Sequence, residues 1–153
     1  MIRQGIKADA QALANLVRGL GWFEYLEQEA ETDTVVRIEQ YIEQFIENPH
    51  NTFLVATDAH DLAIAFVVVN WQPYIVFPGC EGFISELFVH VDHRGNGTGK
   101  QLLQHIQEEG RQRNCFRLML VNKKDRESYQ RGFYTKAGWQ ERDGVANFIW
   151  RPL

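Results

Sequence analysis

The sequence predicts an α/β (α+β) protein in which a mixed, mostly antiparallel central sheet is flanked by helices. Three observations lead to this prediction: two apolar patterns of helical period come first, three β-rich segments follow, and strand and helix patterns then alternate. With 153 residues, 44% of them hydrophobic, the chain is about the size of one domain. We therefore expect a single domain over residues 1–153.

The first third of the chain is predicted to hold a short edge strand, residues 1–6, and two amphipathic helices. Asp9 can cap the first helix and Gly21 can end it, whereas Asn48-Pro49 should end the second. An acidic, aromatic stretch, GWFEYLEQEAETD, separates the two helices. Their apolar faces recur at steps of three and four residues and consist of Leu13, Leu16, Val17 and Leu20, then Val35, Ile38, Ile42 and Phe45.

Strand-like segments follow. NTFLVAT and LAIAFVVVNW, joined by a turn at residues 58–61, are typical of an antiparallel hairpin. After a connection, residues 83–91 are a further strand, and a glycine-rich segment then leads into a helix that ends near Asn114. That helix is expected to bury Leu102, Leu103 and Ile106.

The last third alternates strand and helix. Residues 116–122, FRLMLVN, are apolar on both faces, which predicts a central strand. Residues 126–138 are expected to form one helix that ends at Gly138, with Tyr129, Phe133 and Ala137 on its buried stripe. Residues 145–152, VANFIWRP, should supply the closing strand.

Composition argues against several classes of protein. Sixteen Lys+Arg against 20 Asp+Glu give a formal net charge of −4, whereas nonspecific nucleic-acid binders need a basic face. The start of the chain lacks a secretory pattern, and no run approaches the ~20 apolar residues of a membrane span. We therefore expect a cytoplasmic protein whose partners include neither nucleic acid nor membrane. Cys80 and Cys115 are expected to be structural thiols, and no metal site is predicted.

Residues 94–100, RGNGTGK, are the clearest candidate for a binding site. A glycine-rich turn between a strand and a helix start presents free backbone N–H groups at the positive end of the helix dipole, which favours phosphate. The spacing fits neither a Walker A loop nor a dinucleotide fingerprint, which argues against a nucleotide hydrolase. A purely structural glycine turn is the alternative interpretation.

Arg94, Gly97 and Gly99, placed directly after an apolar strand, resemble the Arg-x-x-Gly-x-Gly signature of the GNAT superfamily of acetyl-CoA-dependent N-acetyltransferases. Further along, GFYTKAGW is similar to the second signature of that family, aromatic-Tyr-x-x-x-Gly-aromatic. The order of the predicted elements also resembles that fold. The resemblance implies a GNAT-like acyl-CoA N-acyltransferase fold that uses acetyl-CoA as co-substrate and needs no metal.

The resemblance also implies how this chain would hold acetyl-CoA. The pantetheine arm would lie in a gap between residues 83–91 and 116–122 and pair with the backbone of Val89 and Val91. The N–H of Val89 would also stabilise the oxyanion that develops on the thioester. The pyrophosphate would be held by the main chain of Arg94, Gly95, Asn96, Gly97, Thr98, Gly99 and Lys100.

For proton transfer, the resemblance implies Tyr134 as the general acid toward the leaving thiolate, with a packing tyrosine as the alternative. Glu86 is the candidate general base, and His90, an ordered water or a backbone carbonyl are the alternatives. Many relatives carry an asparagine at the position of Glu127. In this chain Asn122 could supply a cofactor contact instead.

The acceptor is expected to be a primary amine of a small molecule or of a protein. Acidic and aromatic residues in the regions that usually line the acceptor pocket suit a cationic, polyamine-like amine, although a solvated loop explains the same residues. These residues are Trp22, Phe23, Glu24, Tyr25, Glu27, Glu29 and Glu31, and later Trp71, Tyr74 and Phe77. A non-catalytic CoA-binding module is the alternative function, and a homodimer is compatible with the resemblance.

Overall fold

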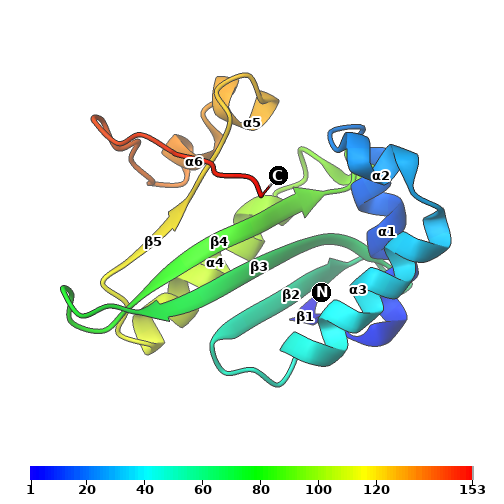
Figure 1. The fold of residues 1–153 in the computed structure, drawn as a ribbon, viewed down its shortest axis with the longest axis horizontal. Helices are drawn as coiled ribbons and strands as arrows, with labels where there is room; N and C mark the ends of the chain where they lie inside the picture. The colour runs from blue at the N-terminus through cyan, green and yellow to red at the C-terminus, as the bar shows by residue number, and fades with distance from the viewer. Residues whose placement is uncertain (153) are drawn as a thin grey trace. The chain divides into compact units, whose positions relative to one another are not determined.

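The computed structural model describes residues 1–152, which divide into a first compact unit, Met1–Val121, and a second unit that begins at Asn122 (Figure 1). Each unit is described by itself. In the described residues no helix is both long and apolar enough to cross a bilayer.

The first unit is built on a five-stranded sheet in the order β1-β2-β3-β4-β5. Neighbouring strands are antiparallel from β1 to β4, whereas β4 and β5 are parallel. The mixed, mostly antiparallel sheet predicted from the sequence is therefore confirmed. The strands are β1 (Ile2–Gln4), β2 (Asn51–Thr57), β3 (Ala63–Pro73), β4 (Cys80–Val89) and β5 (Arg117–Leu120).

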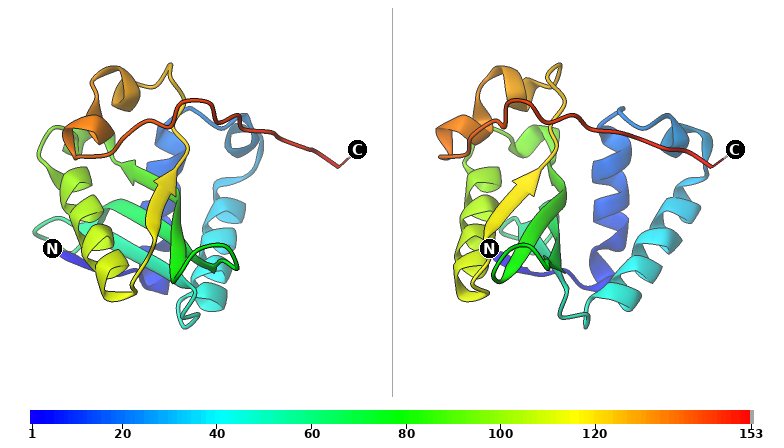
Figure 2. Two further views of the ribbon diagram at one scale, coloured as in Figure 1. Left: turned by 90° about the vertical axis from the view of Figure 1, so that its left-hand side faces the viewer. Right: turned by 60° about the vertical axis from the view of Figure 1, so that its left-hand side comes forward.

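Helices cover both faces of this sheet. Figure 2 shows α4 on one side of the sheet and α1 and α3 on the other. The short helix α2 lies in the acidic, aromatic stretch, for which the sequence predicted no helix. The helices of this unit are η1 (Lys7–Asp9), α1 (Ala10–Gly19), α2 (Glu24–Gln28), α3 (Glu31–Phe45), η2 (Val91–His93) and α4 (Thr98–Gln112).

The alternation of side chains along β3 divides the core into two layers. Phe66 and Val68 face α1 and α3, where they pack with Leu13 and Ile42. Val67, Val69 and Trp71 alternate with these residues along β3 and face α4. Val67 and Val69 are fully buried there. Because both layers are apolar, the strand reads as a nearly continuous hydrophobic run in the sequence.

The N-terminus of α1 differs from the prediction. Asp9 makes no side-chain cap on α1. Its carboxylate instead accepts two hydrogen bonds of 2.8 Å from the guanidinium of Arg3 and one of 2.8 Å from the N–H of Ile6. The predicted ends of α1 and α4 are confirmed, because Gly21 and Asn114 adopt the left-handed conformation just beyond Gly19 and Gln112.

β5 is an edge strand of the described sheet, so the predicted central position is wrong. Its apolar character has a local cause, because Leu118 packs against Gly82 of β4 and Gly110 of α4. A residue larger than glycine at position 82 would collide with Leu118 and with Trp71. The packing of Leu118 against β4 and α4 therefore explains part of the apolar sequence that predicted a strand buried on both faces.

Cys80 and Cys115 are joined by a disulfide, which corrects the prediction of two separate thiols. Cys80 begins β4 and Cys115 precedes β5, and the parallel pairing of these strands brings the two Cα atoms within 4.6 Å. Nothing in a sequence separation of 35 residues indicates that pairing.

A buried ion pair lies beside the disulfide. Glu81 is 1% exposed, and its carboxylate accepts hydrogen bonds from Nε of Arg117 and from the hydroxyl of Tyr74. Replacing Arg117 by methionine should lower the free energy of unfolding by roughly 3 kcal/mol, because a buried carboxylate loses its counter-charge. Arg111→Met, which breaks an exposed pair with Glu108, should cost under about 1 kcal/mol. Urea denaturation of both variants measures the difference, and equal losses would contradict this account.

The second unit contains two short helices, α5 (Glu127–Gln130) and α6 (Phe133–Lys136), where the sequence predicted one. The division has a local cause, because Gly132 between them adopts φ of +65°, a left-handed conformation that ends a helix. Gly138, with φ of +87°, ends α6 as predicted. Residues 145–152 form no strand in the structure, so the predicted closing strand is wrong.

Candidate active site

One edge of β4 is free along half of the strand. β5 pairs with Glu81–Ile84 and with no later residue of β4, and no other strand of the described residues pairs with that edge. A β-bulge marks the point of separation. Ile84 pairs with Val69 and Glu86 with Val68, which leaves Ser85 as the extra residue. The two parallel strands therefore pair only up to this bulge.

The direction of the free backbone groups follows from the β3–β4 ladder. The N–H of His90 donates to the carbonyl of Ile64 at 2.8 Å, so the N–H of Val89, one residue earlier, points away from β3 toward the free edge. The carbonyl of Val89 accepts a hydrogen bond from Nε of Arg94 at 3.2 Å. The N–H of Val89 is therefore available to a ligand along this edge, and its binding of the pantetheine arm remains a prediction.

Val91 occupies a different environment. β4 ends at Val89, and Val91 begins the 3-10 helix η2, so the predicted strand end at Val91 is wrong. The carbonyl of Val91 accepts the N–H of Arg94 at 3.3 Å. The chain leaves the sheet through η2 and continues into the glycine-rich loop.

The glycine-rich loop forms a cradle of backbone N–H groups. Gly95 and Gly97 adopt φ of +81° and +82°, and α4 begins directly afterwards at Thr98. In the part of the chain that the structure describes, the N–H groups of residues 95–100 have no hydrogen-bond acceptor. A Cβ atom added to Gly95 or Gly97 would meet nothing within 4 Å, so the space beside the loop is open. Free N–H groups at the start of a helix favour an anion such as a phosphate group, and binding of a phosphate here remains a prediction.

The cationic side chains of the loop differ in their surroundings. Arg94 fastens the loop to β4 through its bond to Val89, and its guanidinium carbon lies 5.8 Å from the ring centre of Trp22. Lys100 is exposed on the first turn of α4. Arg94 therefore positions the loop, whereas the charge of Lys100 is exposed to solvent next to it.

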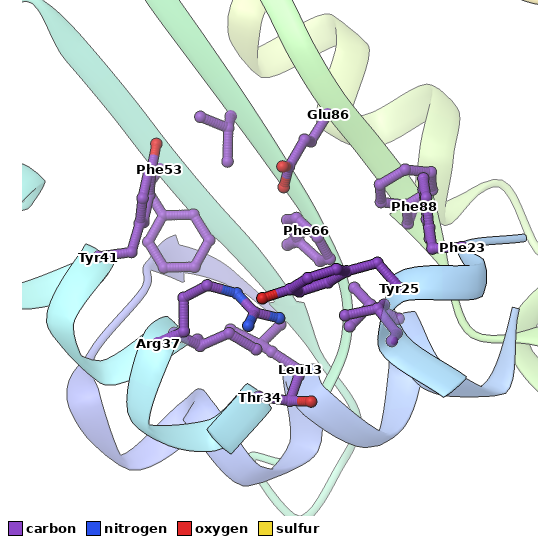
Figure 3. Close-up of a pocket in the computed structure, with 14 residues that line it drawn as sticks. Leu13, Phe23, Tyr25, Thr34, Arg37, Tyr41, Phe53, Phe66, Glu86 and Phe88 are labelled. Carbon is purple, nitrogen blue, oxygen red and sulfur yellow. The ribbon is translucent and has the colours of Figure 1, made fainter. Parts of the chain in front are cut away.

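A pocket of about 370 Å³ lies between the sheet and α1, α2 and α3 (Figure 3). Six of the lining side chains are aromatic, and most of the others are aliphatic. The lining residues are Leu13, Val17, Phe23, Tyr25, Leu26, Thr34, Arg37, Ile38, Tyr41, Phe53, Phe66, Val68, Glu86 and Phe88. The volume is typical of small-molecule sites, which span roughly 300 to 1,000 Å³.

Glu86 brings a carboxylate into this pocket. It follows the bulge in β4, and Figure 3 shows its side chain directed toward the space between Tyr41 and Phe66. The residue is exposed by its accessible surface, but the apolar side chains packed around its carboxyl group desolvate it and raise the pKa of Glu86 above its usual range. Burial, and next the negative charge of Glu86, raise the pKa of Tyr41. A carboxyl with a raised pKa in an apolar pocket is typical of a general base.

The second candidate base lies elsewhere. His90 does not line the pocket, and its Nδ1 accepts the N–H of Asp92 at 3.3 Å. Its ring contacts that of His93, with centroids 5.7 Å apart. Of the two side chains weighed as the base, the structure therefore brings only Glu86 to the pocket.

In the second unit, Tyr134 lies in α6 between Phe133 and Trp139, with ring centroids 5.0 and 6.2 Å away. Burial raises the pKa of Tyr134 to about 12, so its phenol stays protonated over the whole neutral range. Asn122 shares hydrogen bonds of 3.2 and 3.3 Å with the side chain of Ser128. The roles of Tyr134 as general acid and of Asn122 as a cofactor contact remain predictions.

The sequence model of the Acetyltransferase (GNAT) family matches residues 18–139, which span most of the chain and include both signatures. The chain belongs to the GNAT family. No curated protein has a sequence that matches it.

Solved structures show the same fold as this GNAT protein. It is similar to a transcriptional regulator from Bacillus halodurans C-125, with 20% identity and a TM-score of 0.82, covering 97% of this chain and 99% of that chain. It is similar to a ribosomal-protein-alanine N-acetyltransferase from Brucella melitensis biovar Abortus 2308, with 19% identity, a TM-score of 0.71 and 99% of each chain covered. Glucosamine-6-phosphate N-acetyltransferase from Arabidopsis thaliana matches at 16% identity and a TM-score of 0.74, covering 99% of this chain and 98% of that chain.

The acidic stretch of this GNAT protein contributes less to the pocket than the sequence suggested. Among the residues predicted to line an acceptor site, only Phe23 and Tyr25 do so. Glu24 and Glu27 are exposed, and Trp71 is buried in the core layer that faces α4. Among residues 1–152, no three His, Cys, Asp or Glu side chains gather as metal ligands would.

Several pocket residues were missed. Arg37 and Tyr41 come from α3, where they stand four residues apart on either side of the predicted apolar position Ile38. Helical spacing places all three on one face. Phe66 and Val68 pair across the sheet with Phe88 and Glu86, which places them under the same pocket. The spacing on α3 was readable in the sequence, whereas the pairing register was not.

Proposed function

We propose that this GNAT protein transfers the acetyl group of acetyl-CoA to a primary amine by direct attack in a ternary complex. The observation that carries the proposal is the cradle of unbonded N–H groups at residues 95–100, which adjoins the free edge of β4. Membership of the GNAT family and the carboxylate of Glu86 in the neighbouring pocket support it.

The proposed reaction needs few side chains. Acetyl-CoA supplies an activated thioester. The phosphates of its CoA part are bound by the main chain of residues 95–100. The amine nitrogen attacks the thioester carbon, the C–S bond breaks, and Glu86 accepts the proton that the nitrogen loses, directly or through a water. Tyr134 donates a proton to the leaving thiolate. The N–H of Val89 stabilises the oxyanion, an effect worth roughly 3 to 4 kcal/mol for a single donor.

Calorimetric titration with CoA tests the cradle directly. Gly97→Ala should weaken CoA binding roughly tenfold, because an alanine at φ of +82° is strained by about 1 to 2 kcal/mol and relaxes by turning N–H groups out of the cradle. Gly144→Ala is the matched control, since Gly144 also has a left-handed φ, +73°, and no atom near its added Cβ. It should leave CoA affinity within about twofold of wild type. A wild-type protein that binds no CoA would refute the proposal.

The alternative is a CoA-binding module of the same fold without catalysis. Such a module would bind CoA through the same cradle, and it would release no thiol from acetyl-CoA with any amine. Thiol release, followed with acetyl-CoA and a set of primary amines, therefore separates the two functions.

A further inference from the structure

We infer that the acceptor is an arylalkylamine, a primary amine joined to an aromatic ring through a short alkyl chain, and that the pocket between the sheet and α1, α2 and α3 receives the ring. The inference rests on the proposed function, because it identifies the substrate class of that same site. It also replaces the polyamine-like acceptor suggested by the acidic stretch of the sequence.

Aromatic side chains line the pocket in a continuous series. Phe23, which directly precedes α2, contacts Phe88 of β4 at 6.0 Å between ring centroids, and Phe88 contacts Phe66 of β3 at 5.6 Å. Phe66 contacts Phe53 of β2 at 6.1 Å, and Phe53 contacts Tyr41 of α3 at 6.3 Å. All four pairs are edge-to-face, a geometry that aromatic rings prefer, and a ligand ring in the pocket could make the same kind of contact with them.

The charges that face the pocket are few. Glu86 and Arg37 are the charged side chains among its lining residues. Both terminal nitrogens of Arg37 donate to the carboxylate of Glu29 at 2.6 Å, and the side chain of Glu29 is only 11% exposed. Arg37 is therefore neutralised by Glu29, and Glu86 is left as the carboxylate available to a ligand.

A single carboxylate discriminates between amines. One ammonium group can pair with Glu86 before it loses its proton, but the further cations of a polyamine would find no second carboxylate in the lining and would lie near the cationic Arg37. Burial of an unpaired charge in such surroundings is strongly unfavourable. An arylalkylamine carries one charge on its amine and buries an apolar ring, so it matches both features of the pocket.

The wall opposite the sheet is held in place without a ligand. Arg18 of α1 donates from Nη1 to the carbonyl of Leu26 at 2.6 Å and to the hydroxyl of Thr34 at 3.1 Å. Thr34 in turn donates to the carboxylate of Glu29 at 2.7 Å. These bonds join α1, α2 and α3, so the pocket is preformed and little binding energy is needed to order it.

Glu86 and Phe88 determine how the amine would lie. Their side chains point to the same face of β4, two residues apart, and both line the pocket (Figure 3). Val89, whose N–H points to the free edge, is the next residue along. An amine that pairs with Glu86 therefore lies close to the free edge of β4, while its ring extends toward Phe23 and Tyr25 of α2.

The test compares three amines as acceptors: 2-phenylethylamine, propylamine, which lacks the ring, and spermidine, which carries additional charges. Thiol release should give a kcat/KM for 2-phenylethylamine at least about tenfold above either of the others, because burial of an aromatic ring is worth more than one factor of ten. Equal or higher values for propylamine or spermidine would overturn the inference. The proposed function would survive that result.

Two variants locate the effect in the pocket. Phe23→Ala and Tyr25→Ala remove rings that are 40% and 69% exposed, so the fold should persist, and thermal unfolding checks that it does. Each should lower kcat/KM for 2-phenylethylamine several-fold more than it lowers the value for propylamine. Gln28→Ala, on the exposed side of α2, is the matched control and should change neither value. An equal loss for both amines in the ring variants would contradict the inference.

Binding measurements distinguish a failure of the proposed function from a failure of the inference about the acceptor. CoA alone is titrated first, because a lack of CoA binding would refute the proposed function and, with it, the inference. Calorimetry of the CoA-loaded protein with 2-phenylethylamine and with propylamine then measures the pocket itself. Tighter binding of 2-phenylethylamine by at least about tenfold supports the inference even where thiol release is slow, and equal binding overturns it.

Discussion

Replacing Tyr134 by phenylalanine should lower kcat for acetyl transfer by roughly 10²- to 10³-fold, which is the usual contribution of a positioned general acid. The substitution keeps the ring and removes only the hydroxyl that would protonate the leaving thiolate. Burial raises the pKa of Tyr134 to about 12, so the phenol carries its proton at every pH at which the enzyme would be assayed. The loss should therefore be the same from about pH 6 to about pH 9, where an unperturbed phenol of pKa ~10 is also protonated.

Tyr129→Phe is the matched control for this experiment. Tyr129 is also a tyrosine of the second unit, and its hydroxyl donates to the carboxylate of Glu141 at 2.8 Å. Its loss removes a surface hydrogen bond and should leave kcat within about twofold of wild type. Calorimetry should show unchanged CoA affinity for both variants. If kcat of the Tyr134 variant equals that of the control, Tyr134 is a packing residue, which was the alternative interpretation of the sequence.

The parts of the fold that the sequence predicted depend on local rules. The steps of three and four residues in α1 and α3 report a buried helix face, and both helices are present. The glycine-rich loop was equally readable, because φ above +80° at Gly95 and Gly97 favours glycine wherever it occurs. Glu86 could be placed in the site because strand alternation puts it in phase with Phe88.

The parts that were missed depend on contacts between distant segments. The Cys80–Cys115 bond requires the parallel register of β4 and β5, and no local pattern contains it. The edge position of β5 was missed for the same reason, because an apolar run of residues does not distinguish a central strand from an edge strand. Most of the pocket lining was missed, beyond Phe23 and Tyr25, because it joins Arg37 and Tyr41 of α3 to rings of three different strands. The split at Gly132 is the exception, because a glycine inside a helical pattern was visible.

Glu86→Gln should lower kcat/KM at neutral pH by roughly 10²-fold, because the amide cannot accept the proton of the attacking amine. The pH dependence gives a second readout. Burial raises the pKa of Glu86, so the wild-type kcat/KM should rise with pH through a midpoint above the usual carboxyl range and then level off. In the variant, kcat/KM should no longer rise through this midpoint. The change that the ionisation of the substrate amine causes near pH 10 should remain. A rise through this midpoint that persists in the variant would assign the base to another group.

Stability separates this role from a structural one. A raised pKa means that the folded protein favours the protonated carboxyl, so the stabilisation that Glu86 provides is present at low pH and is lost as the pH rises through the raised pKa. At neutral pH the ionised carboxylate opposes folding, and glutamine should therefore leave the melting temperature unchanged or raise it. Glu47→Gln, an exposed carboxylate after α3, should change neither activity nor stability. A large loss of activity without a loss of stability is typical of a residue kept for catalysis at the expense of the fold.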